Sequence, residues 1–128
     1  MNPKEKALFV AGLAISKKAE DIVILDMKKL SNITNFFIIA TASSSKRAQT
    51  IADTIEEGLS KKKMSLSGTE GYREANWILI DAFDVIAHIF SKEARAFYNL
   101  ESLWGDARKV RLCQKKKKRT SKKNSPKE

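Results

Sequence analysis

The sequence is poor in the residue types that carry metal or nucleophilic chemistry. His88 is the only histidine and Cys113 the only cysteine among 128 residues. A zinc site needs four ligands, or three and a water. A Ser–His–Asp triad would have to use His88, which lies between Ala87 and Ile89 in a run typical of a strand. We therefore expect no catalytic residues, no metal site and no cofactor.

A second candidate chemistry is phosphate binding at residues 43–47. Three serines, a lysine and an arginine follow an expected strand and open an expected helix. The N–H groups at a helix start can hold a phosphate, and this layout also occurs in nucleotidyltransferases. Such enzymes need paired carboxylates for magnesium, whereas Asp81 and Asp84 are three residues apart across an expected turn. Helix capping explains the serines, and a nucleotidyltransferase stays an alternative.

Basic residues are concentrated at the C-terminus. Residues 111–128 carry nine bases and one acid, a net of +8, whereas residues 1–110 carry 16 bases and 14 acids, a net of +2. We expect one domain over residues 1–108 and a basic, disordered tail over 109–128, because like charges repel and few apolar residues are present.

Such a tail would bind phosphate backbones without reading sequence. The candidate RNA contacts are Lys115, Lys116, Lys117, Lys118 and Arg119. Two alternatives are a tail that only aids solubility and a general RNA-binding module that uses the tail. The apolar run at residues 7–15 is too short to span a membrane and fits a helix face. The single cysteine fits a reducing compartment, so we expect a cytoplasmic protein without membrane contacts.

Apolar periodicity predicts a single α/β (α+β-like) domain with a mixed sheet packed by helices. Asn2 and Pro3 can begin a helix that runs to about Lys18. Strands at 22–26 and 36–41 are joined by a link too short for a helical crossover, so we expect antiparallel neighbours. The further expected elements are a helix capped by residues 43–45, a polar loop with Gly68 and Gly71, a hairpin of strands 77–81 and 85–90, and helical segments 92–98 and 100–104.

Both faces of the expected hairpin are mostly apolar. Trp77, Leu79 and Asp81 share one face because successive strand side chains point to opposite sides. Helices can cover one face of the sheet, and the other needs more of the chain or a partner. An aromatic side chain beside a carboxylate is typical of an interface anchor. The alternative is that these residues belong to an ordinary core.

The motifs together resemble the family of ribosomal silencing factors (RsfS/Iojap). The most specific combination is the Trp77–Asp81 run, the Asp-Val-Ile-Ala-His-Ile-Phe run at 84–90, and Phe-Tyr-Asn-Leu-Glu-Ser-Leu-Trp at 97–104. Further matching segments are residues 21–26, 34–41, 51–53, 70–71 and 93–95. The resemblance covers about residues 5–108.

The resemblance implies a nucleotidyltransferase-like α/β fold without catalytic groups. It implies binding to the large ribosomal subunit through its ribosomal protein number fourteen, which lies on the face that meets the small subunit. Steric occlusion there would block subunit joining and repress translation. A role in large-subunit biogenesis is also implied and is not separated from silencing. The oligomeric state stays open, with a homodimer of the free protein as one alternative.

Carried over by position, the expected partner-binding residues are Trp77, Asp81, His88, Tyr98, Leu100 and Trp104. The family usually has Asp-Tyr where this chain has Asn35-Phe36, and glycine at Ala42 and Phe83. Phe83 is the larger departure, because a bulky residue disfavours positive φ in a tight turn.

Overall fold

The computed structural model describes residues 1–110, so the lysines and Arg119 of the expected RNA-binding tail lie outside the described residues. This part of the chain contains four helices and six strands. Their bounds are α1 Pro3–Ser16, β1 Glu20–Asp26, β2 Phe36–Thr41, α2 Ser45–Lys61, β3 Gly68–Glu70, β4 Trp77–Asp81, β5 Val85–Phe90, α3 Lys92–Tyr98, α4 Leu100–Leu103 and β6 Arg108–Val110.

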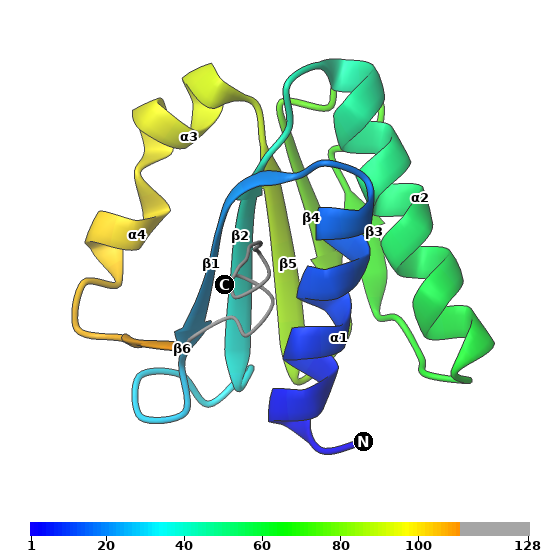
Figure 1. The fold of residues 1–128 in the computed structure, drawn as a ribbon. Helices are drawn as coiled ribbons and strands as arrows, with labels where there is room; N and C mark the ends of the chain where they lie inside the picture. Colours follow the sequence, from blue (N-terminus) through cyan, green and yellow to red (C-terminus); the bar gives the residue numbers. More distant parts are fainter. Residues whose placement is uncertain (111–128) are drawn as a thin grey trace, which may run out of the picture.

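The strands form one mixed sheet in the order β3-β4-β5-β2-β1-β6. The central pair β2 and β5 is parallel, and the other neighbours are antiparallel. Helices α1 and α2 cover one face of the sheet, and the shorter α3 and α4 lie on the other (Figure 1). The prediction of a single domain with a mixed sheet packed by helices is confirmed, as are the antiparallel β1–β2 pair and the β4–β5 hairpin.

Both long helices begin where capping residues stand. The Asn2 side chain accepts a hydrogen bond from Glu5 N at 2.8 Å, and the Glu5 carboxylate accepts one from Asn2 N at 3.0 Å, which forms a capping box. At α2, the Ser44 hydroxyl accepts from Arg47 N at 3.0 Å. The inner face of α2 carries Ala48, Ile51, Ala52, Ile55 and Leu59, all buried against the sheet and α1.

A buried ion pair fixes α1 to the turn between β4 and β5. Lys6 is 8% exposed, and its ammonium donates to Ala82 O at 2.6 Å and to Asp84 Oδ1 at 2.8 Å. An ammonium buried this deeply is stable only while both acceptors remain, since losing one partner of a buried pair leaves an uncompensated charge. The contact therefore joins the first turns of α1 to the β4–β5 turn across 78 residues of chain.

Two strands were not predicted. Residues 68–70 form β3, which pairs with β4, so the expected polar loop is wrong at this point. Residues 108–110 form β6, which pairs with β1, so the sheet extends past the expected domain end at residue 108. Each strand is three residues long and exposed or half-buried, and its pairing depends on a neighbour that is distant in sequence. Helix α1 also ends at Ser16, before the expected Lys18, which adopts positive φ.

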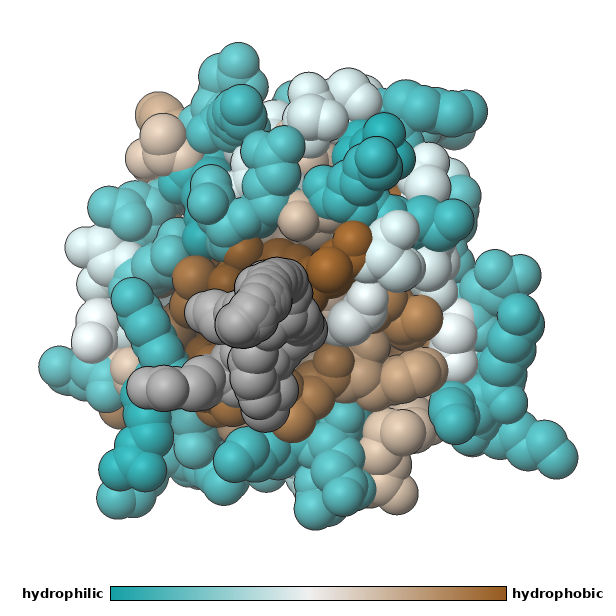
Figure 2. Space-filling view, viewed as in Figure 1, coloured by the Kyte–Doolittle hydropathy of each residue, from teal (hydrophilic) through white to brown (hydrophobic). Residues whose placement is uncertain are grey.

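Apolar side chains reach the surface at several places. Figure 2, viewed as in Figure 1, shows apolar side chains at the centre of this side of the molecule and hydrophilic ones around its rim. The most exposed large apolar residues are Ile33 at 82%, Phe97 at 80% and Leu103 at 71%. Among residues 1–110, no helix has the length and apolar character needed to cross a membrane.

The β4–β5 turn places Phe83 in a conformation that favours glycine. Phe83 has φ +70°, its N–H donates to Asp81 Oδ1 at 3.0 Å, and its ring is 54% exposed. The ring therefore contributes little burial, while the backbone conformation costs about 1–2 kcal/mol for an L-residue with a Cβ. A glycine at this position would relieve the strain.

Phe83→Gly should raise the free energy of unfolding by about 1 kcal/mol, because the relief of positive-φ strain exceeds the greater chain entropy of glycine. Urea denaturation of the two proteins measures the difference. Phe83→Ala is the matched control, since it removes the same ring and keeps the Cβ strain. Equal stability of the glycine and alanine variants would contradict this account.

Candidate protein-interaction face

The face of the sheet opposite α1 and α2 brings the expected site residues together. In the hairpin register, Trp77 lies opposite Phe90 and Leu79 opposite His88. The parallel β2–β5 register places Phe37 beside Ile86. We call this surface the aromatic face. Its members are Phe37, Trp77, Leu79, Asp81, Ile86, His88 and Phe90 from the strands, with Tyr98, Leu100 and Trp104 from α3, α4 and the α4 C-cap.

Trp77 is half-buried and held in one orientation. Its indole Nε1–H donates to His88 Nδ1 at 3.1 Å. The ring centroids of Phe90 and Tyr98 lie 5.0 Å and 4.8 Å from that of Trp77. Gly71, at φ +80°, lets the preceding loop pass so close to the Trp77 carbonyl that a Cβ could not be placed there. The indole is therefore ordered before any partner arrives, which lowers the entropy cost of binding through it.

His88 supports Trp77 from beneath and remains neutral. Its imidazole is 4% exposed, and Nδ1 accepts the Trp77 hydrogen bond, so the ring proton sits on Nε2. Burial lowers the pKa of His88 from 6.5 to about 4. Within residues 1–110, Nε2 has no hydrogen-bond partner. The histidine expected from the sequence as a partner contact is thus placed behind the surface, where it orients Trp77.

Tyr98, Leu100 and Trp104 lie around the same cluster at different depths. Tyr98 is 51% exposed and contacts Trp77, whereas Leu100 is half-buried and packs on the apolar residues beneath α4. Trp104 is half-buried and meets Phe37 edge to face, with ring centroids 6.1 Å apart. Phe37 also meets the His88 ring edge to face, with ring centroids 4.6 Å apart. Five of the six expected residues are thus joined in one cluster.

Arg95 holds α3 and α4 in place over the sheet. Its guanidinium makes two 3.0 Å hydrogen bonds to the Glu101 carboxylate. Its remaining nitrogen donates to Asp21 O at 2.6 Å and to Thr41 Oγ1 at 2.8 Å. These bonds tie the short helices to the ends of β1 and β2, away from β4. As a result, Leu79 and Trp77 of β4 stay half-exposed.

Asp81 lies at the far end of β4 from Trp77. Its Oδ1 accepts the Phe83 N–H at 3.0 Å, and no hydrogen bond within residues 1–110 engages Oδ2. The side chain is half-exposed. The aromatic face therefore carries a tryptophan at one end of β4 and a fixed carboxylate at the other, about 13 Å away at the usual strand rise.

An apolar groove adjoins the aromatic face between the loop at residues 30–34, β2, β5 and Trp104. Leu30, Ile33, Phe37, Ile86 and Trp104 contribute to its walls, and its volume is about 430 Å³. Phe37, Ile86 and Ile33 were not predicted as site residues. Phe37 could have been found by extending the two-residue strand alternation to β2. Ile86 could have been found because it lies on the same side of β5 as His88 and Phe90. Ile33 is 82% exposed in a loop and carries no such signal.

The groups considered for phosphate chemistry have other roles. Ser44 caps α2, as the sequence suggested. Asp84 pairs with Lys6, and Asp81 accepts from the β4–β5 turn, so the two carboxylates do not share a site. In the part of the chain that the structure describes, no group of three or more His, Cys, Asp or Glu side chains could hold a metal ion.

The neutral state of His88 makes stability depend on pH. The folded pKa is about 4, below the unfolded value of 6.5, so the unfolded chain takes up the proton first. The stabilisation is present above pH 6.5 and is lost as the pH falls towards 4, on the order of 3 kcal/mol for this shift. Urea denaturation at several pH values measures it. His88→Phe should lack this loss, whereas Trp77→Phe, which breaks the same hydrogen bond, should keep it. An unchanged pH dependence in His88→Phe would refute the assignment.

The sequence matches one protein-family model and several curated relatives. The family model described as "Ribosomal silencing factor during starvation" matches residues 1–128. The ribosomal silencing factor RsfS of Halalkalibacterium halodurans is 41% identical over 112 residues, which cover 88% of this chain and 96% of that protein. The RsfS of Bacillus subtilis is 40% identical, covering 84% and 91%. The chloroplastic Iojap protein of Zea mays is 36% identical, covering 83% of this chain and 46% of its own length.

Solved structures agree with these matches. A crystal structure from Chromobacterium violaceum superposes with a TM-score of 0.81 at 28% identity, covering 88% of this chain and 93% of that one. One from Bacillus halodurans gives a TM-score of 0.77 at 38% identity, covering 85% and 99%. The expected resemblance is confirmed, and the chain belongs to the ribosomal silencing factor family.

Proposed function

We propose that this protein binds the large ribosomal subunit through its ribosomal protein number fourteen and sterically blocks the small subunit from joining, which represses translation. The observation that carries the proposal is the half-exposed Trp77, oriented by His88 and bordered by Tyr98. Tryptophan and tyrosine are enriched among residues that dominate binding energy. We also propose a cytoplasmic location, which the bacterial RsfS relatives support.

The chemistry of the aromatic face fits a basic protein surface. Asp81 presents a carboxylate oxygen that no hydrogen bond within residues 1–110 engages, and the neighbouring strand residues are apolar and half-buried. A partner would bury the apolar centre and meet the carboxylate with a cation. The proposed role requires no reaction, and the arrangement of Asp81 and Asp84 in separate contacts gives no support to the nucleotidyltransferase alternative.

The proposal extends to the residues outside the described structure. The lysines and Arg119 of residues 115–119 would add affinity for ribosomal RNA. The proposal also gives this face a role in large-subunit assembly, because a factor that occupies the joining surface can bind maturing as well as mature subunits.

Trp77→Ala in the full chain should weaken binding to the purified large subunit by about thirtyfold, because the anchor of the face is lost (~2 kcal/mol). Co-sedimentation with separated large and small subunits measures this, with thermal melting as the check on folding. Tyr72→Ala, a half-exposed tyrosine beside α2, is the matched control and should bind normally. Wild-type binding by Trp77→Ala, or equal binding to both subunits by the unaltered chain, would sink the proposal.

Asp81→Asn should keep the turn hydrogen bond and lose only the charge. We expect binding to the large subunit to weaken three- to tenfold at low salt and to converge with the wild type at high salt, because screening weakens charge pairs that are not fully buried. Glu57→Gln, on the exposed side of α2, removes the same charge elsewhere and should have no effect. Identical salt dependence in the Asp81 and Glu57 variants would exclude an ionic contact at Asp81.

A further inference from the structure

Basic side chains gather where β1 ends and β6 begins. Lys4, Lys28, Lys29, Arg108 and Lys109 all line one or both of two adjoining hollows, and all five are exposed. We call this set the basic edge. It brings together the first turn of α1, the loop after β1 and the last strand, which are far apart in sequence.

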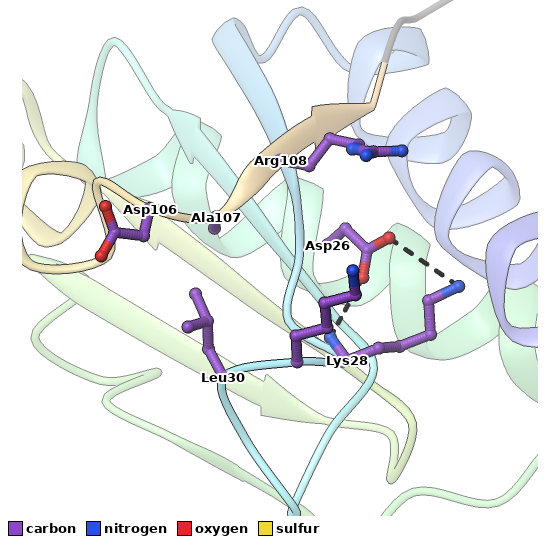
Figure 3. Close-up of a pocket in the computed structure, with 7 residues that line it drawn as sticks. Asp26, Lys28, Leu30, Asp106, Ala107 and Arg108 are labelled. Carbon is purple, nitrogen blue, oxygen red and sulfur yellow. Dashed lines mark hydrogen bonds and ion pairs between the residues drawn. The ribbon is translucent and has the colours of Figure 1, made fainter.

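The pairing of β6 with β1 builds this surface. Arg108 lies opposite Asp26, and Lys109 lies opposite Leu25. Figure 3 shows the side chains of Asp26, Lys28 and Arg108 around one hollow, with Asp106 on its other side. The cluster thus depends on a strand that the sequence did not predict, and it could not be recognised from the sequence.

The basic edge has more cations than acids can neutralise. Five bases and two acids, Asp26 and Asp106, line the two hollows, a net of +3. Asp26 is engaged by Lys28, with Nζ to Oδ2 at 3.7 Å and Oδ1 accepting the Lys28 N–H at 3.0 Å. The Lys28 ammonium also lies 5.4 Å from the centre of the Phe36 ring. Within residues 1–110, the other four bases form no ion pair.

The basic edge adjoins the proposed protein-binding surface. Leu30 lines both the apolar groove of the aromatic face and the hollow that holds Lys28, Lys29 and Arg108. In the sequence, Lys109 is followed within two residues by the segment that has nine bases and one acid. An apolar groove bordered by exposed cations has the chemistry to take a protein surface that lies next to a phosphate backbone.

We propose that the basic edge binds the phosphate backbone of ribosomal RNA beside the docked ribosomal protein, so that the folded body holds a phosphate site of its own. The inference rests on the proposed function for its choice of RNA. Lysine and arginine on a small, fixed surface bind phosphates by charge, with little reading of sequence. The body would then select a position on the ribosome by contacting protein and RNA at once.

The test uses the full chain and protein-free large-subunit ribosomal RNA, with affinity measured at several salt concentrations. The triple variant Lys29→Ala, Arg108→Ala, Lys109→Ala should flatten the plot of log affinity against log salt by about 2–3, since each lost phosphate contact removes about 0.7–0.9 from the slope. The control is Lys17→Ala, Lys61→Ala, Arg73→Ala, which removes the same charge from exposed positions elsewhere and should change the slope by less than about 1.

Equal slopes of log affinity against log salt for the two triple variants would overturn the inference. The RNA would then respond to the total charge of the protein and not to the position of the basic edge. The same variants are also sedimented with the intact large subunit. If the basic-edge variant alone flattens the RNA slope while no protein binds the large subunit, the phosphate site stands and the proposed function fails. If all proteins bind the large subunit and neither variant alters the RNA slope, the proposed function stands and the phosphate site fails.

Discussion

A sheet with large apolar side chains on both faces must be covered twice. Strands β2 and β5 lie side by side at its centre and are buried on both faces, as parallel strands usually are. Helices α1 and α2 cover the first face, where the central strand residues are buried in one core cluster. Within residues 1–110, the second face is covered by two short helices, which Arg95 fixes near β1 and β2. Strand β4 therefore keeps Trp77, Leu79 and Asp81 half-exposed, and this incomplete cover creates the aromatic face.

The exposed part of that face is rigid. Trp77 donates to a neutral, buried His88, and aromatic contacts connect the pair to Tyr98 and Phe90. A partner that binds there gains contact area without ordering the anchor. The basic edge differs in kind, since its exposed lysines attract phosphate by charge. One surface thus supplies a fitted apolar contact, and its neighbour supplies electrostatic attraction.

Local sequence signals accounted for the helix starts, the hairpin and the antiparallel β1–β2 pair. They could not predict β3 and β6, whose three residues become strands only because β4 and β1 offer unpaired edges. Among the site residues, Trp77 and Asp81 followed from strand alternation. The position of His88 behind Trp77 needed the register between two strands, and the contact of Phe37 with Trp104 needed the path of the chain after α4. Phe83 stood out in the sequence as a bulky residue in a tight turn, and its φ of +70° explains why glycine would suit this position.

The central claim is that occupation of the aromatic face by the large subunit prevents subunit joining. Light scattering of mixed, purified subunits measures joining directly. The full chain, preincubated with the large subunit at saturating concentration, should lower the yield of joined ribosomes. Excess small subunit should raise that yield again, because the chain and the small subunit compete for the same surface of the large subunit. Undiminished joining while the chain remains bound to the large subunit would contradict the account.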